Sequence, residues 1–358
     1  TNAVTLVQNG SDKIGGSTVN AILSTEGLAV TLIYIDSTQG WLVTDDGLQS
    51  VANTNPYMVA TGGTETTSGN CKIHTFTGPG TFCVSKAALA AADNLVSYMV
   101  VGGGGGAGTG SNVAGQSSGG GGGAGGFREV ISPSSPYSGS PLNGYPNAPN
   151  RITVTVQGYP IDVGSGGAGG IQCGPFSAGF TGTIGAVSTF SSITGAGGGA
   201  GGSGGSADAG QGASGGGGGA QDCGATGNTP PVSPAQGTNG SAGASDAGGA
   251  GGGATVASSN ATPENGADGG AGATTSINAT PTAYAGGGGG AGETTKGCGG
   301  AGGGGAGFTN GSNGAGSGVA GTANTGGGGG GAQSNSNPTP TSGGNGGSGV
   351  IIIRYRYQ

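Results

Sequence analysis

Charged residues are scarce in this chain. Asp, Glu, Lys and Arg together make up 6% of its 358 residues, the formal net charge is −7, and histidine occurs once. No group of lysines and arginines offers the clustered cations that release counterions from a phosphate backbone, so we expect no nucleic-acid partner. A surface of neutral polar residues suits a scaffold better than an acid–base active site. We therefore predict a protein with no enzymatic activity and no cofactor.

Long apolar runs are also missing. The longest, "LAVTLIYI" and "VIII", have the length of β-strands and fall well short of the ~18 residues that a membrane-spanning helix needs. We expect no membrane insertion. No signal peptide opens the sequence, and its first residue is Thr, so either an initiator Met has been removed or the sequence is part of a longer chain.

Cysteine is too sparse for a zinc site. The five cysteines form no C-x-x-C or Cys/His cluster, and an odd number leaves at least one unpaired. Cys71 and Cys83 flank a predicted hairpin with its turn at Gly78 and Pro79, so a disulfide between them needs a slipped register. That bond stays open, and free thiols in a reducing cytoplasm are favoured. The aspartates of the glycine-rich part are spaced too irregularly for calcium-binding repeats, and we predict no metal site.

Residues 1–53 have the pattern of a small antiparallel β-module. Apolar and polar residues alternate in short pieces between Asn-Gly, Glu-Gly and Gln-Gly turns, which predicts three or four strands with Trp41 in their core. Such a sheet is marginal alone, so we expect it to pack on a partner copy or on the next segment. Residues 54–97 continue as a β-hairpin module, in which His74 is predicted to lie on the sheet surface.

Glycine dominates residues 98–358. Only 11 of the 97 glycines precede residue 101, and runs of glycine alternate with polar inserts from Gly102 onward. Few aromatic and branched side chains would normally mean disorder, but the high net charge that accompanies disorder is absent. The alternative is a lattice of polyproline-II-type helices, in which glycine lets backbones approach and hydrogen bond to their neighbours. Taking every third residue over 195–219 gives only Gly and Ala, as such packing requires.

Two apolar runs bracket the glycine-rich segment. "YMVVGGGGGAG" opens it and "GGSGVIIIRYRY" closes it, and we predict that these runs are strands that pair with each other. "RITVTVQG", residues 151–158, predicts a further strand. With "KAALAAAD" forming one helical turn at most, the expected fold class is all-β modules followed by packed polyglycine-II helices, with essentially no α-helix.

The same boundary motifs, with "ITVTVQGYPIDVGSGGAGG" and "STFSSITGAGGGAGG", resemble the glycine-rich domain of bacteriophage tail-fibre and other virion proteins. "TLVQNGSDKIGGS" and "ATGGTETTSGNCKIHTFTGPGTFCV" are similar to β-modules of marine and cyanobacterial phage structural proteins. The resemblance implies a layered polyglycine-II sandwich whose inter-run loops contact a receptor. It also implies that the N-terminal module mounts or trimerises the protein.

The expected function is therefore a tail-fibre or spike adhesin, located in the virion and assembled in the host cytoplasm. Its expected partners are other virion proteins, further copies of itself as a homotrimer, and a host-surface glycan or outer-membrane protein. The alternative is a capsid-decoration or head-fibre protein. Aromatics beside polar residues in the inserts can stack on sugars or fill receptor pockets. The receptor-contact candidates are Tyr137, Tyr145, Tyr284, Phe176, Phe180 and Phe308.

Overall fold

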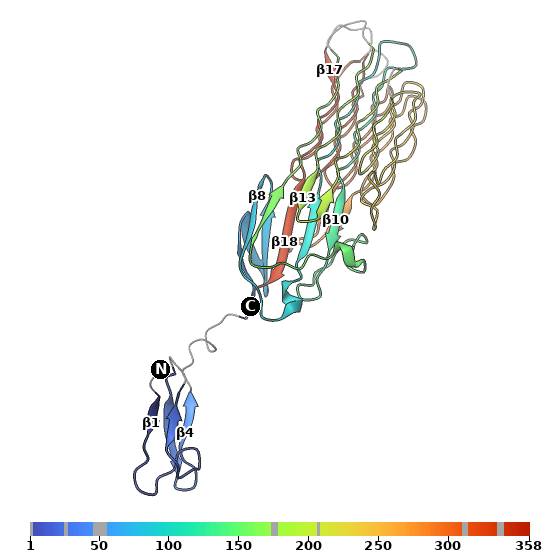
Figure 1. Cartoon of the computed structure of the whole chain (residues 1–358). Coiled ribbons are helices and arrows are strands. Elements are labelled where there is room, and N and C mark those ends of the chain that lie inside the picture. Colours follow the sequence, from blue (N-terminus) through green and yellow to red (C-terminus); the bar gives the residue numbers. More distant parts are fainter. Residues whose placement is uncertain are drawn as a thin grey trace. The chain divides into compact units, whose positions relative to one another are not determined.

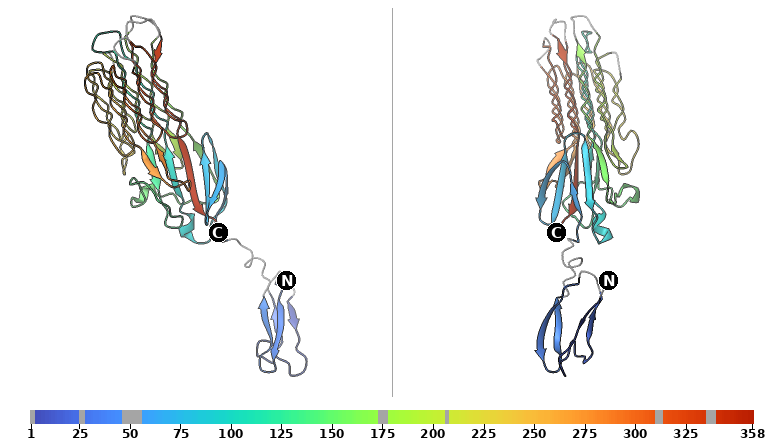
Figure 2. Two further views of the ribbon diagram at one scale, coloured as in Figure 1. Left: turned by 180° about the vertical axis from the view of Figure 1, so that it is seen from behind. Right: turned by 60° about the vertical axis from the view of Figure 1, so that its left-hand side comes forward.

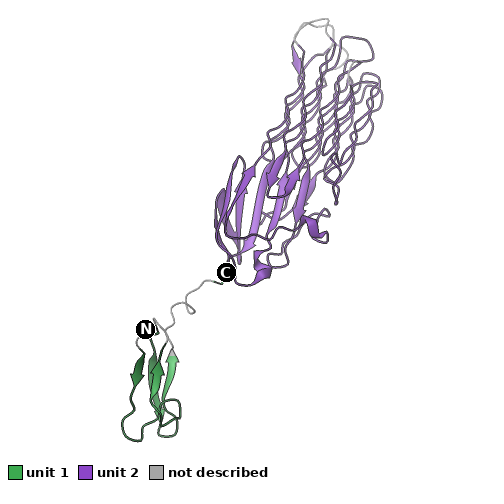
Figure 3. Ribbon diagram, in the orientation of Figure 1, with its two compact units in different colours: residues 1–56 green, residues 57–358 purple. Residues whose placement is uncertain are grey.

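The computed structural model describes residues 3–24, 28–45, 56–172, 178–205, 208–309, 314–334 and 340–358. The chain divides into two compact units, residues 1–56 and residues 57–358, called unit 1 and unit 2 below (Figure 3). The described residues contain eighteen strands and only two short 3-10 turns, Ala91–Asn94 and Ala148–Asn150. The prediction of an all-β fold is confirmed.

Unit 1 consists of two separate two-stranded sheets. β1 (Val4–Leu6) pairs with β2 (Ala21–Leu23), and β3 (Thr31–Asp36) pairs with β4 (Gly40–Asp45). The four strands match the sequence pattern, but they do not form the single meander it suggested. Trp41 was expected in a core and is instead 40% exposed, with its ring meeting that of Tyr34 edge to face at a centroid distance of 5.5 Å.

Unit 2 contains two five-stranded antiparallel sheets, whose strands come from both ends of its sequence (Figures 1 and 2). The first sheet has the order β10-β9-β18-β7-β6 and the second has the order β14-β13-β11-β8-β5. Their strands are β5 (Val59–Thr61), β6 (Thr64–Ser68), β7 (Cys71–Phe76), β8 (Gly80–Lys86), β9 (Ser97–Val101), β10 (Phe127–Val130), β11 (Gly158–Asp162), β13 (Ser188–Phe190), β14 (Ile193–Gly195) and β18 (Val350–Arg356). Two small pairs complete the unit, β12 (Ile171–Gln172) with β17 (Thr341–Ser342) and β15 (Ala273–Thr275) with β16 (Thr282–Tyr284).

The two strands that bracket the glycine-rich segment pair as predicted. β18 lies antiparallel beside β9, with Val350 opposite Val101 and Ile353 opposite Tyr98. The other edge of β18 pairs with β7, so the C-terminal strand occupies the centre of its sheet. The start and the end of the glycine-rich segment are therefore held by the same pair of strands.

The predicted hairpin around Gly78 and Pro79 is wrong. The chain does turn there, but β7 and β8 enter different sheets and do not pair with each other. The hairpin of this region is β6–β7, closed by Gly69 and Asn70, with Gly69 at a φ of 55°. Cys71 and Cys83 consequently belong to different sheets, and both are free thiols.

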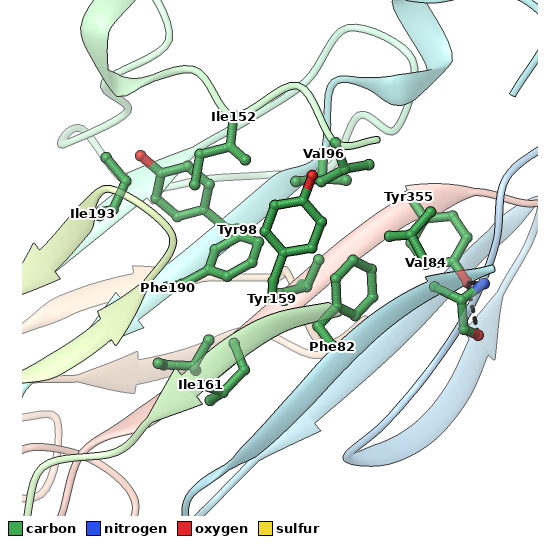
Figure 4. Close-up of a cluster of buried hydrophobic side chains, with 14 of the residues drawn as sticks. Phe82, Val84, Val96, Tyr98, Ile152, Tyr159, Ile161, Phe190, Ile193 and Tyr355 are labelled. Carbon is green, nitrogen blue, oxygen red and sulfur yellow. Dashed lines mark hydrogen bonds between the residues drawn. The ribbon is translucent and has the colours of Figure 1, made fainter. Parts of the chain in front are cut away.

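An aromatic cluster fills the space between the two sheets (Figure 4). Phe82 is fully buried and meets Phe190 and Tyr355 edge to face, with ring centroids 6.2 and 6.1 Å apart. Edge-to-face contacts of this kind add to the free energy gained from burying the rings. Most of the large apolar side chains are gathered here, so the sheets hold the hydrophobic core of unit 2.

His74 lies in this core, and its prediction as a surface residue is wrong. Its side chain is 0% exposed, Nδ1 donates to the carbonyl of Gly62 at 2.7 Å, and Nε2 accepts from the Tyr355 hydroxyl at 3.2 Å. The Tyr355 oxygen in turn accepts from the Ala60 N–H at 3.2 Å. Burial lowers the pKa of His74 below 6.5, against the opposing effect of the Gly62 bond. The neutral imidazole therefore supports the Tyr355 hydroxyl within the first sheet, and the bond from Ala60 of β5 to that hydroxyl links the two sheets.

Two further boundaries differ from the sequence pattern. Residues 151–155 alternate between exposed and buried positions and lie beside residues 94–96 through the Leu95–Thr153 bridge, but the strand itself is β11. Residues 54–97 were expected as a module of their own. Their strands pair with β11 and β18, which belong to residues 98–358, so both parts lie in unit 2.

Beyond the sheets, the glycine-rich segments run side by side (Figures 1 and 2). Successive N–H groups of residues 102–109 donate hydrogen bonds to different neighbouring segments, and the same acceptor segment recurs at every third residue. Gly102, Gly105 and Gly108 all donate to one segment, at 2.9–3.0 Å. Counting bonds donated and accepted, six segments surround residues 102–109: 120–126, 180–186, 344–347, 167–170, 198–204 and 329–332. The backbone of this central segment is thereby satisfied without side chains.

Glycine is required where these segments touch. A Cβ on Gly103 would lie 2.6 Å from the carbonyl carbon of Ser165, and most interior glycines meet a neighbouring backbone carbonyl as closely. Residues 195–219 do not form one continuous run, as the three-residue period suggested. The chain reverses after Gly205, at a φ of 72°, and again near Ala213, so this stretch supplies three antiparallel passes.

Candidate functional site

The turns between glycine-rich segments gather at the end of unit 2 that lies away from the sheets, called the apical end below (Figure 1). Within the described residues, the backbone pairing places nine connections there, because each pass that leaves the sheets is followed by one that returns. Their described residues lie within 110–118, 171–172 and 178–179, 204–205 and 208, 220–222, 243–247, 262–265, 292–296, 308–309 and 314–316, and 333–334 and 340–342. Both ends of unit 2 lie at the opposite end, where Arg356 donates to the Tyr57 hydroxyl at 3.1 Å.

The apical end contains a pocket of about 290 Å³, called the apical pocket below. Four of the apical loops contribute to it, so residues far apart in the sequence converge on one cavity. Polar and apolar groups both line it, and seven of its ten residues have polar or charged side chains: Ser111, Asn112, Ser117, Asp246, Glu293, Gln333 and Ser334, beside Val113, Ala114 and Gly115.

Hydrogen bonds between loops hold the pocket walls. The Asp246 N–H donates to the carbonyl of Gly115 at 3.1 Å, and the Ser117 N–H donates to Asp246 Oδ1 at 3.3 Å. The Ser334 N–H donates to the carbonyl of Ser117 at 2.8 Å, which joins the third loop. Asp246 adopts a φ of 53°, a left-handed conformation that Asp tolerates better than most residues. The pocket is therefore preformed by the backbone.

Acidic residues outnumber basic residues in the glycine-rich segments and in the loops at the apical end. Across residues 164–349 the sequence has six acidic residues and one basic residue, Lys296. Two of the acids, Asp246 and Glu293, line the apical pocket. Next to it, burial and the nearby charge of Asp208 raise the pKa of Asp222, against a hydrogen bond from the Gly205 backbone. Such a lining suits ligands rich in hydroxyl or amine donors and disfavours anions.

Two of the described aromatic candidates lie at or beside the apical loops. Phe180 is 45% exposed and begins a returning segment, where its N–H bonds Thr109 Oγ1 at 2.9 Å. Phe308 is half-buried, with its ring packed against Gly316. Phe176 lies outside the described residues.

The three tyrosine candidates lie near the sheets. Tyr284 is 6% exposed within the core, so it offers no surface for a receptor. Tyr137 is half-buried beneath Arg354, whose guanidinium lies 5.4 Å from the ring centre, and burial together with Glu129 raises its pKa well above 10. Tyr145 is half-buried and stacks under Arg151 at 4.4 Å. The structure therefore does not bring the five described candidates together.

Buried polar residues fix the loop that carries Tyr137 and Tyr145. Glu129, 2% exposed, accepts from the backbone N–H of Ser140 at 2.8 Å and from the Thr275 hydroxyl at 2.5 Å. Arg128 donates to Asn150 Oδ1 at 2.7 Å. These bonds serve packing at the sheet end, because a buried carboxylate is tolerated only when its oxygens are paired.

The residues of the apical pocket were missed from the sequence. The predicted receptor contacts were all aromatic. The inserts that line the pocket contain no aromatic residue, and they carry Asn112, Asp246, Glu293 and Gln333. The alternation of glycine runs and inserts could have predicted that these inserts lie at one end, since every second insert between antiparallel passes must lie at the same end. The sequence does not show which passes are neighbours, so it does not predict which inserts meet in a pocket.

Within the described part of the chain, no group of three or more His, Cys, Asp or Glu side chains is arranged to hold a metal ion. The same residues contain no helix of sufficient length and hydrophobicity to cross a membrane.

Comparison with known proteins gives one match. A family model described as a glycine-rich domain matches residues 75–356, from the end of β7 to the end of β18. The match covers both five-stranded sheets in large part and all of the glycine-rich segments. No curated protein matches the chain.

Proposed function

Because this chain belongs to the glycine-rich domain family, we propose that its glycine-rich segments are polyglycine-II helices that present a binding surface at the apical end. Support for the helix type comes from the rotation of hydrogen-bond partners with a period of three, the number of residues per turn in this helix. The helices serve as a rigid support, and the loops serve as the variable part. Binding residues on loops held by a rigid scaffold are a common arrangement.

The proposed role is that of a non-enzymatic virion protein, a tail-fibre or spike adhesin that contacts a host-surface glycan or outer-membrane protein. The observation that carries it is the convergence of the apical loops on a polar pocket, at the end of unit 2 opposite to Tyr57 and the C-terminal strand. Unit 2 begins at Tyr57, so the apical loops lie at the other end of unit 2 from the residue at which unit 1 joins it. The resemblance of the boundary motifs to phage fibre proteins supports the same role.

Binding to an array of immobilised bacterial surface glycans and to outer-membrane vesicles tests the proposal. We expect the full chain to bind at least one of these probes, and the double variant Asn112→Ala/Glu293→Gln to bind it at least tenfold more weakly. Asp162→Asn is the matched control, since Asp162 is an exposed acid at the sheet end. Equal binding by the double variant and the control would refute a role of the apical pocket.

The second candidate function is capsid decoration or a head fibre, which the same rigid scaffold would also serve. Immunogold labelling of virions with antibodies against unit 2 distinguishes the two. Label at fibre tips supports the adhesin, and label on capsid lattice sites supports decoration.

A further inference from the structure

A cavity of about 620 Å³ lies at the sheet end of unit 2, away from the apical loops, and is called the arginine cavity below. Three parts of the chain line it: the turn between β6 and β7, the loop that follows β10, and the end of β18. It shares no residue with the apical pocket. Receptor binding at the apical end therefore leaves this cavity without a role.

Two arginines line the arginine cavity, and none of its lining residues is acidic. Arg354 and Arg356 are separated by one residue in β18, which pairs with β7 in an unbroken register over Ile351–Arg356. Because side chains alternate along a strand, both arginines lie on the same face of the sheet, with Cα atoms about 7 Å apart. Two like charges this close repel each other, and an anion held by both removes that repulsion.

Arg354 has fewer partners than a buried guanidinium needs. Its side chain belongs to a residue that is 7% exposed, and Nη1 donates to the carbonyl of Ile277 at 3.3 Å. The Nε–H is buried and has no hydrogen-bond partner in the described part of the chain. Burying a charge is unfavourable unless it is paired and fully hydrogen-bonded. Since Arg354 lines the cavity, a group bound there can provide the missing acceptor.

The acids close to this end of the sheet have other partners. Glu129 and Arg354 both act on the Tyr137 hydroxyl, but the Glu129 carboxylate accepts hydrogen bonds from two other residues and forms no ion pair with Arg354. Glu65 of β6 is paired with Lys72 at 3.0 Å. The two positive charges of the cavity are thus left without a carboxylate partner among the described residues.

Positive charge is placed here although the chain as a whole is acidic. The sequence has eight Lys and Arg residues against fifteen Asp and Glu residues, and two of the eight cations line this cavity. A net charge of −7 repels anions from the surface in general. An anion that binds this chain therefore depends on the local arrangement of the arginines.

We propose that the arginine cavity binds a tetrahedral oxyanion, a phosphate or sulfate group, held by Arg354 and Arg356. Guanidinium groups recognise such oxyanions through paired, charge-assisted hydrogen bonds. Two cations match a group with about two negative charges better than a carboxylate with one. Ser68, Asn70 and Ser134 also line the cavity and offer hydroxyl and amide donors to the remaining oxygens.

The size of the cavity allows the oxyanion to be part of a larger molecule. A water molecule occupies about 30 Å³ in the liquid, and the cavity measures about 620 Å³. The same chemistry can therefore come from a free ion or from a sugar phosphate.

Titration calorimetry of the full chain tests the proposal, at neutral pH in Tris chloride of fixed ionic strength. The probes are sulfate, inorganic phosphate, glucose 1-phosphate and acetate. We expect sulfate and phosphate to saturate one site and acetate to bind at least tenfold more weakly. Arg354→Gln and Arg356→Gln should each weaken sulfate binding at least tenfold. Arg356 is half-buried, so its variant keeps the test valid if Arg354→Gln fails to fold.

The matched control is Arg151→Gln, which should bind sulfate within about twofold of the wild type. Arg151 is an exposed arginine that stacks on Tyr145, as Arg354 and Arg356 stack on Tyr137 and Tyr57, but it does not line the cavity.

Glucose 1-phosphate distinguishes the two sources of the oxyanion. Binding at least tenfold tighter than that of inorganic phosphate would assign the cavity to a phosphate carried by a sugar, and equal or weaker binding would assign it to the free ion.

Four results would overturn the proposal. The first is that neither sulfate nor phosphate binds saturably, and the second is that acetate binds as tightly as sulfate. The third is unchanged sulfate binding by Arg356→Gln. The fourth is equal weakening by Arg151→Gln, because binding would then respond to charge in general. None of these results bears on the apical pocket, which shares no residue with this cavity and is tested with its own variants.

Discussion

A single methyl group in the centre of the glycine-rich segments should destabilise unit 2 strongly. In Gly105→Ala, the new Cβ would lie 2.7 Å from the carbonyl carbon of Gly199 and 2.9 Å from the carbonyl oxygen of Gly198, and closer still to the oxygen of Gly199. Real Cβ atoms essentially never approach within 3.0 Å. The obstacle is backbone, so no side chain can rotate away and one of the two segments must shift.

The magnitude follows from what this shift breaks. Gly105 donates to Gly123 at 2.9 Å and accepts from Gly329 at 3.0 Å, so moving it weakens two backbone hydrogen bonds. At about 1 kcal/mol for each bond, with about 1–3 kcal/mol for overpacking, the loss amounts to roughly 3–5 kcal/mol. Compared with a total stability of about 5–15 kcal/mol, this is a large fraction. At about 2–4 °C per kcal/mol, Tm should fall by roughly 10 °C.

Differential scanning calorimetry measures this change, with Gly78→Ala as the control. A Cβ on Gly78 would have no atom within 4 Å, and its φ lies outside the left-handed region, so that variant should unfold within ~2 °C of the wild type. If Gly105→Ala also unfolds within ~2 °C of the wild type, the segments are not packed as closely as the structure shows, and the reasoning fails.

Three further predictions concern the sheets. Burial lowers the pKa of His74 in the folded state, so the stability that neutral His74 contributes is complete above its unfolded-state pKa of about 6.5 and declines as the pH falls below that value. The Tm of the wild type should therefore drop from pH 7 to pH 5, and the Tm of His74→Gln should drop less. Equal drops in both proteins would exclude His74 as the cause. Replacing Val100, Val101, Ile351 and Ile353, all fully buried, by Ser should make the glycine-rich segments protease-sensitive, whereas Ile171→Ser, at a position 60% exposed, should not. Tyr355→Phe removes the hydroxyl that accepts from Ala60 and donates to His74 and should cost about 1–3 kcal/mol in urea denaturation, and an unchanged midpoint would refute this link between the sheets.

The sequence predicted strand content and the pairing of β9 with β18 because both depend on local patterns. An apolar run next to glycine marks the place where side-chain packing gives way to backbone packing, and this boundary occurs at Val101 and again at Val350. Alternation also located the buried positions of residues 151–155, although the ladder itself starts later, at Gly158.

Pairing between distant segments could not be predicted in the same way. The turn at Gly78 and Pro79 has the composition of a hairpin turn, yet it leads from one sheet to the other, because β7 already has β6 and β18 as neighbours. The burial of His74 follows from that same choice of partners. In the glycine-rich segments all passes have nearly the same composition, so side chains carry little information on which passes are adjacent.

The division between core and lattice explains how unit 2 can hold variable loops at its apical end. The aromatic core lies between the sheets, and the segments beyond it rely on backbone hydrogen bonds that are independent of side-chain identity. An insert can therefore change its residues without removing a contact on which the neighbouring passes depend, provided that the glycines remain. Stability is set by the sheets and the glycines, and the proposed recognition would depend on apical residues such as Asn112 and Glu293.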